Sequence, residues 1–192
     1  MKNIFLVLVC ILVSFDILAK VRQNDSHEHG AAKLKMVLEG EILQIELEVP
    51  SESLISFEHF PQSLSDRENF GKAIKILSNP DRLLSIPTEA KCLLVGLHIS
   101  QSLFQQEEEL GHNESEKEEE HGHDESEKPE IHSEFKSNYY WNCQQLDEVD
   151  SIGTQLMTIF PKIEEIRVNW ISNNGQGSLE LESKEDRIKG WK

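Results

Sequence analysis

Histidine and carboxylate side chains gather in two short parts of this chain of 192 residues. The first is HEH, residues 27–29, and the second is GHNESEKEEEHGHDESEKPEIH, residues 111–132. Neutral imidazole nitrogen is a good ligand for zinc, copper and nickel, and carboxylate oxygens can complete such a site. Both parts contain two histidines separated by one residue, a spacing that allows joint chelation. The candidate ligands in them are His27, His29, His112, His121, His123 and His132.

The acidic tract, residues 105–131, contains twelve acidic residues, three histidines, two lysines and only two aliphatic side chains. It cannot bury enough apolar surface to offset its conformational entropy, so we expect disorder when no ligand is bound. It also contains a duplication, GHNESEK followed by GHDESEK, with histidine in both copies. The alternative is a solvated acidic spacer with accidental histidines, and for His27 and His29 a frayed terminus without a role.

Histidines held by a folded domain lose less entropy on binding a metal than histidines in a disordered segment. His132, at the end of the histidine-rich stretch, and His59, in FEHFP, are the candidates for such anchored ligands. We therefore expect one tighter site that combines both kinds of ligand, and weaker sites in the acidic tract. His98 lies in a predicted strand and is expected to be packed or hydrogen-bonded rather than a ligand.

The first 19 residues have the pattern of a cleavable secretory signal. Lys2 gives a cationic start, an apolar run extends over residues 4–13, and the small residue Ala19 precedes the expected cleavage point. Asp16 interrupts the apolar run well short of the roughly 20 residues that a membrane-spanning helix needs. The expected organisation is a removed signal, residues 1–19, and a single domain, residues 20–192.

The formal net charge is −16. Such an excess of negative charge disfavours nucleic acid and anionic membranes as partners and attracts cations. Calcium is a poorer candidate than a transition metal, because the chain has no EF-hand loop and imidazole does not suit a hard ion. No HExxH, GxSxG or P-loop motif occurs, so the sequence does not predict an enzyme.

Two cysteines, Cys92 and Cys143, remain once the signal containing Cys10 is removed. Two cysteines alone make a poor zinc site, and in an oxidising compartment the economical prediction is one disulfide. Strands are predicted over residues 90–104 and 131–143. If they pair antiparallel with Cys92 opposite Cys143, the numbers of paired residues sum to 235, and the acidic tract becomes the tip of this hairpin.

Period-two patterns predict further strands. Residues 34–38 and 43–49 alternate apolar and polar around Glu39 and Gly40, as in a hairpin with one buried face. A third predicted strand, residues 163–172, is followed by the hairpin signal NNGQG, residues 173–177.

Two segments have helical spacing. The first runs over residues 64–77, with Ser65 and Glu68 as the predicted capping box. The second runs over residues 146–160, with apolar residues at every third or fourth position. The predicted fold is therefore α+β: a mainly antiparallel sheet with two main helices and a long disordered His/Glu-rich hairpin loop.

Together, four parts of the sequence resemble the ZrgA-type family of bacterial periplasmic zinc-binding proteins. They are HEHGAAKLKMVLEGEILQIELEVPSESLISFEHFP (residues 27–61), Cys92, HSEFKSNYYWNC (residues 132–143) and FPKIEEIRVNWISNNGQGSLEL (residues 160–181). The resemblance implies Zn(II) as the ligand and the periplasm of a Gram-negative bacterium as the location. It also implies an accessory or chaperone role in zinc uptake, with transfer to an uptake transporter or its binding protein. The ligands it implies are His27, His29, His59 and His132, with His112, His121 and His123 in a His-rich insertion.

Two other functions remain open on the sequence. One is a buffer for zinc or another transition metal without a transfer partner. The other is a metal-independent adaptor that docks a protein through the acidic tract.

Overall fold

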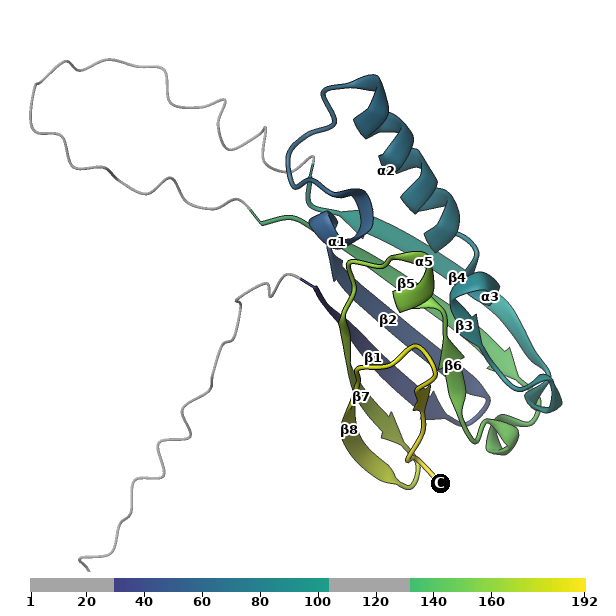
Figure 1. The fold of residues 1–192 in the computed structure, drawn as a ribbon. Coiled ribbons are helices and arrows are strands. Elements are labelled where there is room, and N and C mark those ends of the chain that lie inside the picture. The colour runs from purple at the N-terminus through teal and green to yellow at the C-terminus, as the bar shows by residue number, and fades with distance from the viewer. Residues whose placement is uncertain (1–29, 104–131) are drawn as a thin grey trace, which may run out of the picture.

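The computed structural model describes residues 30–103 and 132–192. A six-stranded sheet in the order β4-β5-β2-β1-β7-β8 dominates the fold, and a three-stranded sheet, β3-β6-β9, lies on one face of it (Figure 1). The large sheet contains β1 (Ala31–Glu39), β2 (Ile42–Pro50), β4 (Cys92–Gln101), β5 (Glu134–Cys143), β7 (Glu165–Ser172) and β8 (Gly175–Leu181). The small sheet contains β3 (Leu84–Ser85), β6 (Ile152–Thr154) and β9 (Arg187–Ile188).

The β1–β2 hairpin confirms the first period-two prediction. The strands pair antiparallel from Lys33 opposite Glu48 to Glu39 opposite Ile42. All the predicted inward residues are buried, because alternate side chains of a strand point to the same face. Gly40 has φ 61°, the left-handed conformation that glycine adopts without steric cost.

β4 and β5 also pair antiparallel, and Cys92 lies opposite Cys143 in a disulfide, as predicted. The predicted register sum of 235 holds only for the first three pairs. A bulge at Val95 then shifts the register by one, so that Gly96 lies opposite Tyr140. An extra residue in one strand exchanges the faces of all residues beyond it, which is why Leu93 and Leu97 do not share a face as their spacing predicts.

One helix is long. It is α2 (Leu64–Leu77), accompanied by α1 (Ser51–Ile55), α3 (Pro80–Leu83), α5 (Leu156–Ile159) and 3-10 helices over Thr88–Ala90 and Leu146–Glu148. The capping box of α2 is formed by Ser63 and Asp66, so the predicted pair Ser65 and Glu68 is wrong by two residues. Ser63 Oγ accepts from Asp66 N–H at 3.0 Å, and Asp66 Oδ2 accepts from Ser63 N–H at 2.9 Å.

The second predicted helix, residues 146–160, is wrong. A 3-10 helix, the strand β6 and the short helix α5 occupy that segment. Gly153 and Thr154 are poor helix formers, and β6 pairs with both β3 and β9, which satisfies its backbone better than an isolated turn would. The apolar residues of this segment nevertheless belong to the core: Val149, Ile152 and Leu156 are all buried.

β7 and β8 form the hairpin predicted from NNGQG, with Ser172 opposite Gly175. β7 also pairs with β1, and this pairing is parallel, so the sheet is mixed. The QG dipeptide has a packing role: a Cβ on Gly177 would lie 2.5 Å from Cζ2 of Trp170. Only glycine leaves room for this indole ring, which packs edge-on against Trp191 with centroids 6.4 Å apart.

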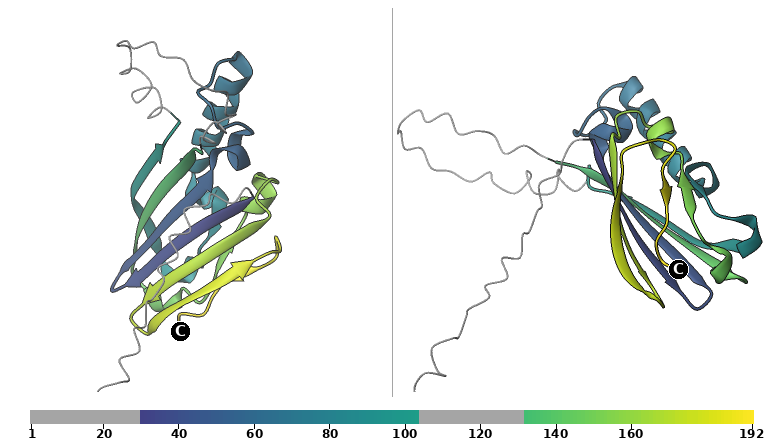
Figure 2. Two further views of the ribbon diagram at one scale, coloured as in Figure 1. Left: turned by 90° about the vertical axis from the view of Figure 1, so that its left-hand side faces the viewer. Right: turned by 60° about the horizontal axis from the view of Figure 1, so that its bottom comes forward.

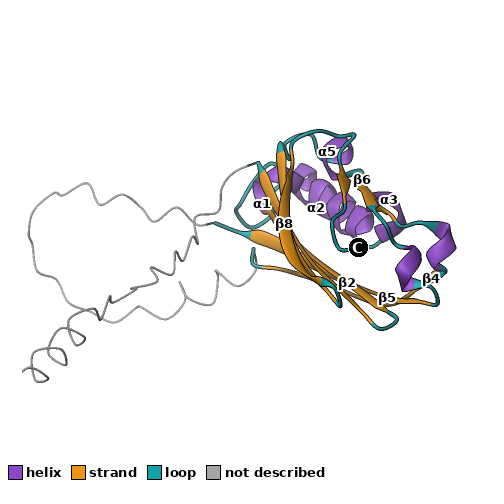
Figure 3. Cartoon of the chain, turned by 90° about the horizontal axis from the view of Figure 1, so that it is seen from below, coloured by secondary structure: helices purple, strands orange, loops and turns teal. Residues whose placement is uncertain are grey.

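The helices and the small sheet cover the same face of the large sheet, as the view from below shows (Figure 3). One contiguous cluster of buried side chains fills the space between them. The prediction of an α+β fold with a mainly antiparallel sheet is thus confirmed in its sheet-rich outline, whereas its second main helix is not. The predicted disordered loop lies outside the described residues. Within residues 30–103 and 132–192, no helix is long and apolar enough to cross a membrane.

Candidate metal site

One end of the large sheet gathers the points at which the described chain begins and breaks. β1 begins there after Gly30, whose carbonyl accepts from Glu164 and Glu165 N–H at the start of β7. β4 ends there as well, since Ser102, the residue after β4, donates its N–H to the carbonyl of Glu134 at the start of β5. Both histidine-bearing segments, residues 27–29 and 112–132, therefore join the fold at this end, where α1 also lies (Figure 1).

The loop that follows α1 lies against the start of β5. Ser51 N–H donates to the carbonyl of Ser133 at 2.8 Å, and Ser133 Oγ donates to the carbonyl of Glu58 at 3.3 Å. Ser56, at the end of α1, has φ 72°, and this left-handed residue turns the chain toward β5. These contacts place Glu58 next to His132, although 74 positions separate the two residues in the sequence.

Glu58 and His132 form an acid–imidazole contact at this end of the sheet. Nδ1 of His132 lies 3.5 Å from Oε2 of Glu58, and both side chains are mostly buried. Oε1 of Glu58 is also buried and has no hydrogen-bond partner among the described residues. Nδ1 of His132 is likewise buried and makes no hydrogen bond to Glu58, so the 3.5 Å contact is a charge contact rather than a hydrogen bond. Histidines that bind zinc through one nitrogen typically have a carboxylate beside the other, and shortening this contact by a few tenths of an ångström would give that arrangement.

His59 is also held in a defined orientation. Its Nδ1 lies 2.8 Å from the carbonyl oxygen of Phe60, and its ring stacks on Phe57 with centroids 4.9 Å apart. A carbonyl oxygen can only accept, so Nδ1 carries the proton, and the lone pair of the neutral ring is on Nε2. That nitrogen is available to a metal, because His59 is exposed.

Asp66 adds a carboxylate near His59. Hydrogen bonds from the backbone and side chain of Ser63 hold the pKa of Asp66 below its usual value, and a positive charge on His59, when its ring is protonated, acts in the same direction. Asp66 Oδ2 accepts hydrogen bonds from both Ser63 N–H and Gln62 N–H, so this oxygen is already used in capping α2.

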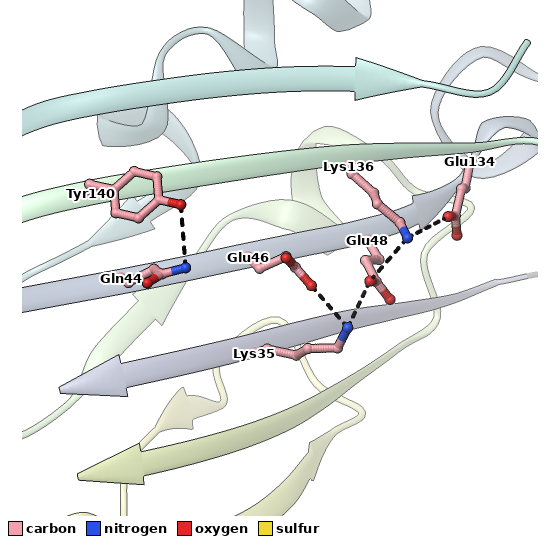
Figure 4. A network of polar contacts seen from close by, with 7 residues as sticks. All are labelled: Lys35, Gln44, Glu46, Glu48, Glu134, Lys136 and Tyr140. Carbon is pink, nitrogen blue, oxygen red and sulfur yellow. Dashed lines mark hydrogen bonds and ion pairs between the residues drawn. The ribbon is translucent and has the colours of Figure 1, made fainter. Parts of the chain in front are cut away.

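The carboxylates on the outer face of the sheet are already paired with lysines (Figure 4). Lys35 Nζ lies 2.9 Å from Glu46 and 2.7 Å from Glu48, and Lys136 Nζ lies 2.9 Å from Glu134. These acidic residues are therefore poor candidates for metal ligands. Glu58 differs from them because its neighbour is an imidazole.

The structure places two of the seven predicted ligands, and both lie at the same end of the sheet: His59 and His132. In residues 30–103 and 132–192, no three His, Cys, Asp or Glu side chains are close enough to hold a metal ion together. The predicted ligands outside the described residues are His27, His29, His112, His121 and His123. His98 is exposed on β4, which contradicts the prediction that it is packed; that it is hydrogen-bonded rather than a ligand stays a prediction.

Glu58 was not among the predicted site residues. Its signal was present in FEHFP, where an acidic residue directly precedes the anchored histidine. What the sequence could not supply is the pairing with His132, because that contact depends on the turn at Ser56 and on the hydrogen bonds of Ser133.

The fold and the site define an extended sheet domain with imidazole and carboxylate groups gathered at one end. A model of the ZrgA family of zinc uptake proteins matches residues 26–190. The chain therefore belongs to the ZrgA family, which confirms the resemblance and associates the protein with zinc uptake. Among curated proteins, none matches this chain.

Proposed function

We propose that the protein binds Zn(II) in the periplasm of a Gram-negative bacterium and supplies it to an uptake transporter or to that transporter's binding protein. The observation that carries this proposal is the position of His59 and of the Glu58–His132 pair at the sheet end where both histidine-bearing segments join the fold. In this proposal zinc is cargo, and the protein performs no catalysis.

The anchored residues have defined tasks in this proposal. His59 offers Nε2, since Phe60 occupies its Nδ1, and His132 offers Nε2 when Glu58 accepts from its Nδ1. Zn(II) prefers four ligands in a tetrahedron, so at least one more ligand has to come from the histidine-bearing segments. The resulting site is the tighter one, because its anchored ligands lose less entropy on binding.

Weaker sites in the acidic tract would serve for collection. A net charge of −16 raises the local concentration of cations, and His112, His121 and His123 then give selectivity for a transition metal over calcium. The proposed order is capture by the tract, passage to the anchored histidines at its base, and delivery.

Competitive Zn(II) titration of residues 20–192, read by native mass spectrometry, tests the binding. We expect the variant His59→Ala/His132→Ala to lose the tightest site and to keep weaker ones. The variant His27→Ala/His29→Ala/His121→Ala/His123→Ala should lose mainly weaker sites. His98→Ala is the matched control, because this exposed histidine on β4 should leave every site unchanged.

Unchanged affinity of the tightest site in His59→Ala/His132→Ala would refute the anchored site. Growth then tests the transport role. A deletion strain that grows poorly only under zinc limitation supports delivery, whereas sensitivity to excess zinc alone contradicts delivery and indicates a buffer.

A further inference from the structure

β4 carries an unusual concentration of exposed apolar side chains. The exposed fractions are 70% for Leu93, 38% for Leu94, 58% for Val95 and 39% for Leu97. These four residues are half of all the large apolar residues that are exposed in residues 30–103 and 132–192. By the register with β5, Leu93 lies on one face of the strand and Leu94 and Leu97 lie on the other, so apolar side chains border the strand from both faces. A cluster of exposed apolar residues on one strand marks an interaction site more often than scattered exposed residues do.

The same strand is an edge of the large sheet. β4 pairs with β5 on one side, and among the described residues no strand pairs with its other side (Figure 2, left). An edge strand presents N–H and C=O groups that another strand can bind, and natural proteins usually protect such edges with charges or proline. β4 has neither, and the bulge at Val95 is the one protective feature it has.

The absence of charged residues on β4 favours a second copy of this protein as the partner. β4 contains no Asp, Glu, Lys or Arg, whereas each of the other five strands of the large sheet contains at least one. Two copies of a protein with net charge −16 repel each other over most of their surfaces, and this uncharged strand is the part of the sheet at which they can approach.

We propose that the protein forms a two-fold symmetric dimer in which β4 of one copy pairs antiparallel with β4 of a second copy. The pairing would satisfy the open backbone edge, and it would bring Val95 and Leu97, near the middle of the strand, close to the same residues of the second copy. A two-fold axis places the same residues on both sides of the contact, so an apolar strand is complementary to itself.

The acidic tract decides between antiparallel and parallel pairing. It begins four residues after β4 ends, so parallel strands would bring the points at which two acidic tracts leave the sheet next to each other. Antiparallel strands of ten residues place these two points about 30 Å apart. That separation is well beyond the screening length of roughly 8 Å at physiological salt, so the repulsion between charges at these two points is largely removed.

Sedimentation velocity of residues 20–192 over a range of protein concentrations tests this proposal. A chelator is present throughout, so the result is independent of zinc binding. We expect the wild type to form dimers, and Val95→Lys and Leu97→Lys each to weaken the dimer about tenfold or more, because each places two like charges close to the two-fold axis at the middle of β4. Ile171→Lys is the matched control, since Ile171 is 56% exposed on β7, away from this edge.

Three outcomes would overturn the proposal. They are a wild type that stays monomeric at every concentration, a dimer that persists in both β4 variants, and equal weakening by Ile171→Lys. Circular dichroism confirms that each variant is folded, and two independent β4 variants keep the test valid if one of them is not.

Discussion

At the scale of single residues, the Glu58–His132 contact is the feature with the most direct bearing on zinc. Removing a carboxylate that orients a metal-binding histidine typically lowers metal affinity about 10- to 100-fold. We expect Glu58→Gln to weaken the tightest Zn(II) site within that range, because the amide of Gln is uncharged and orients the imidazole less firmly.

Competition with a chromophoric zinc chelator measures the effect of Glu58→Gln. Glu52→Gln is the control, since Glu52 lies on α1 near the same end of the sheet but pairs with Lys162 at 3.0 Å. Equal affinities for Glu58→Gln and the wild type would show that Glu58 does not orient a ligand.

Tyr139 is the second residue whose surroundings give a prediction. It is fully buried, and its hydroxyl donates to the carbonyl of Leu77 at 3.0 Å, which satisfies a carbonyl at the end of α2. Tyr139→Phe should lower the free energy of unfolding by about 1 kcal/mol, measured by urea denaturation. In contrast, Tyr140→Phe should have little effect, because the Tyr140 hydroxyl lies 3.5 Å from Gln44 on the outer face.

The same tyrosine gives a pH dependence. Burial raises the pKa of Tyr139 to about 12, from 10.0. Above pH 10 the unfolded chain therefore loses this proton while the folded protein keeps it, so this contribution to stability is complete below pH 10 and is lost as the pH rises toward 12. Tyr139→Phe should show a shallower loss over this interval, and identical slopes would contradict the assignment.

At the scale of elements, the secondary structure was predicted correctly where the conformation of a segment depends on its own sequence. The β1–β2 hairpin was predicted because one face is buried along its whole length and Gly40 forms the turn. The segment over residues 146–160 was not, because β6 owes its conformation to pairing with β3 and β9, which are distant in the sequence. The parallel pairing of β1 with β7 was missed for the same reason.

The start of α2 allows a direct comparison of two serines. Ser63→Ala removes the hydroxyl that accepts from Asp66 N–H and should lower the free energy of unfolding by about 1 kcal/mol. Ser65→Ala alters the serine that the sequence pattern indicated as the cap. It should leave the free energy of unfolding unchanged, because alanine favours the helical conformation. Thermal unfolding of the two variants decides the matter, and a larger loss for Ser65→Ala would contradict the observed cap.

The candidate site was predicted in part for similar reasons. Histidine content and the FEH sequence identified His59 and His132 without a structure, since ligand chemistry depends on residue type. Their common location depends on the turn at Ser56 and on the hydrogen bonds between α1 and β5, which no local pattern encodes.

At the scale of the whole molecule, the disulfide between Cys92 and Cys143 closes a loop whose ends are 51 positions apart. On the chain-entropy estimate such a crosslink stabilises the folded state by about 4 kcal/mol. Cys92→Ser/Cys143→Ser should lower the free energy of unfolding by approximately that amount in urea denaturation. A loss under about 1 kcal/mol would mean that native β4–β5 pairing already restricts the unfolded chain.

The hairpin of β4 and β5 is held at both ends. The disulfide joins the two strands at the end near Cys92. At the opposite end, where the acidic tract follows in the sequence, the hydrogen bond from Ser102 N–H to the carbonyl of Glu134 joins them. Doubling the length of a flexible loop costs only about 0.6 kcal/mol in closure entropy. A short repeat such as GHNESEK and GHDESEK can therefore be gained or lost with almost no effect on folding. Under the proposed function, selection could thus change the number of zinc-binding histidines without changing the folded domain that supports them.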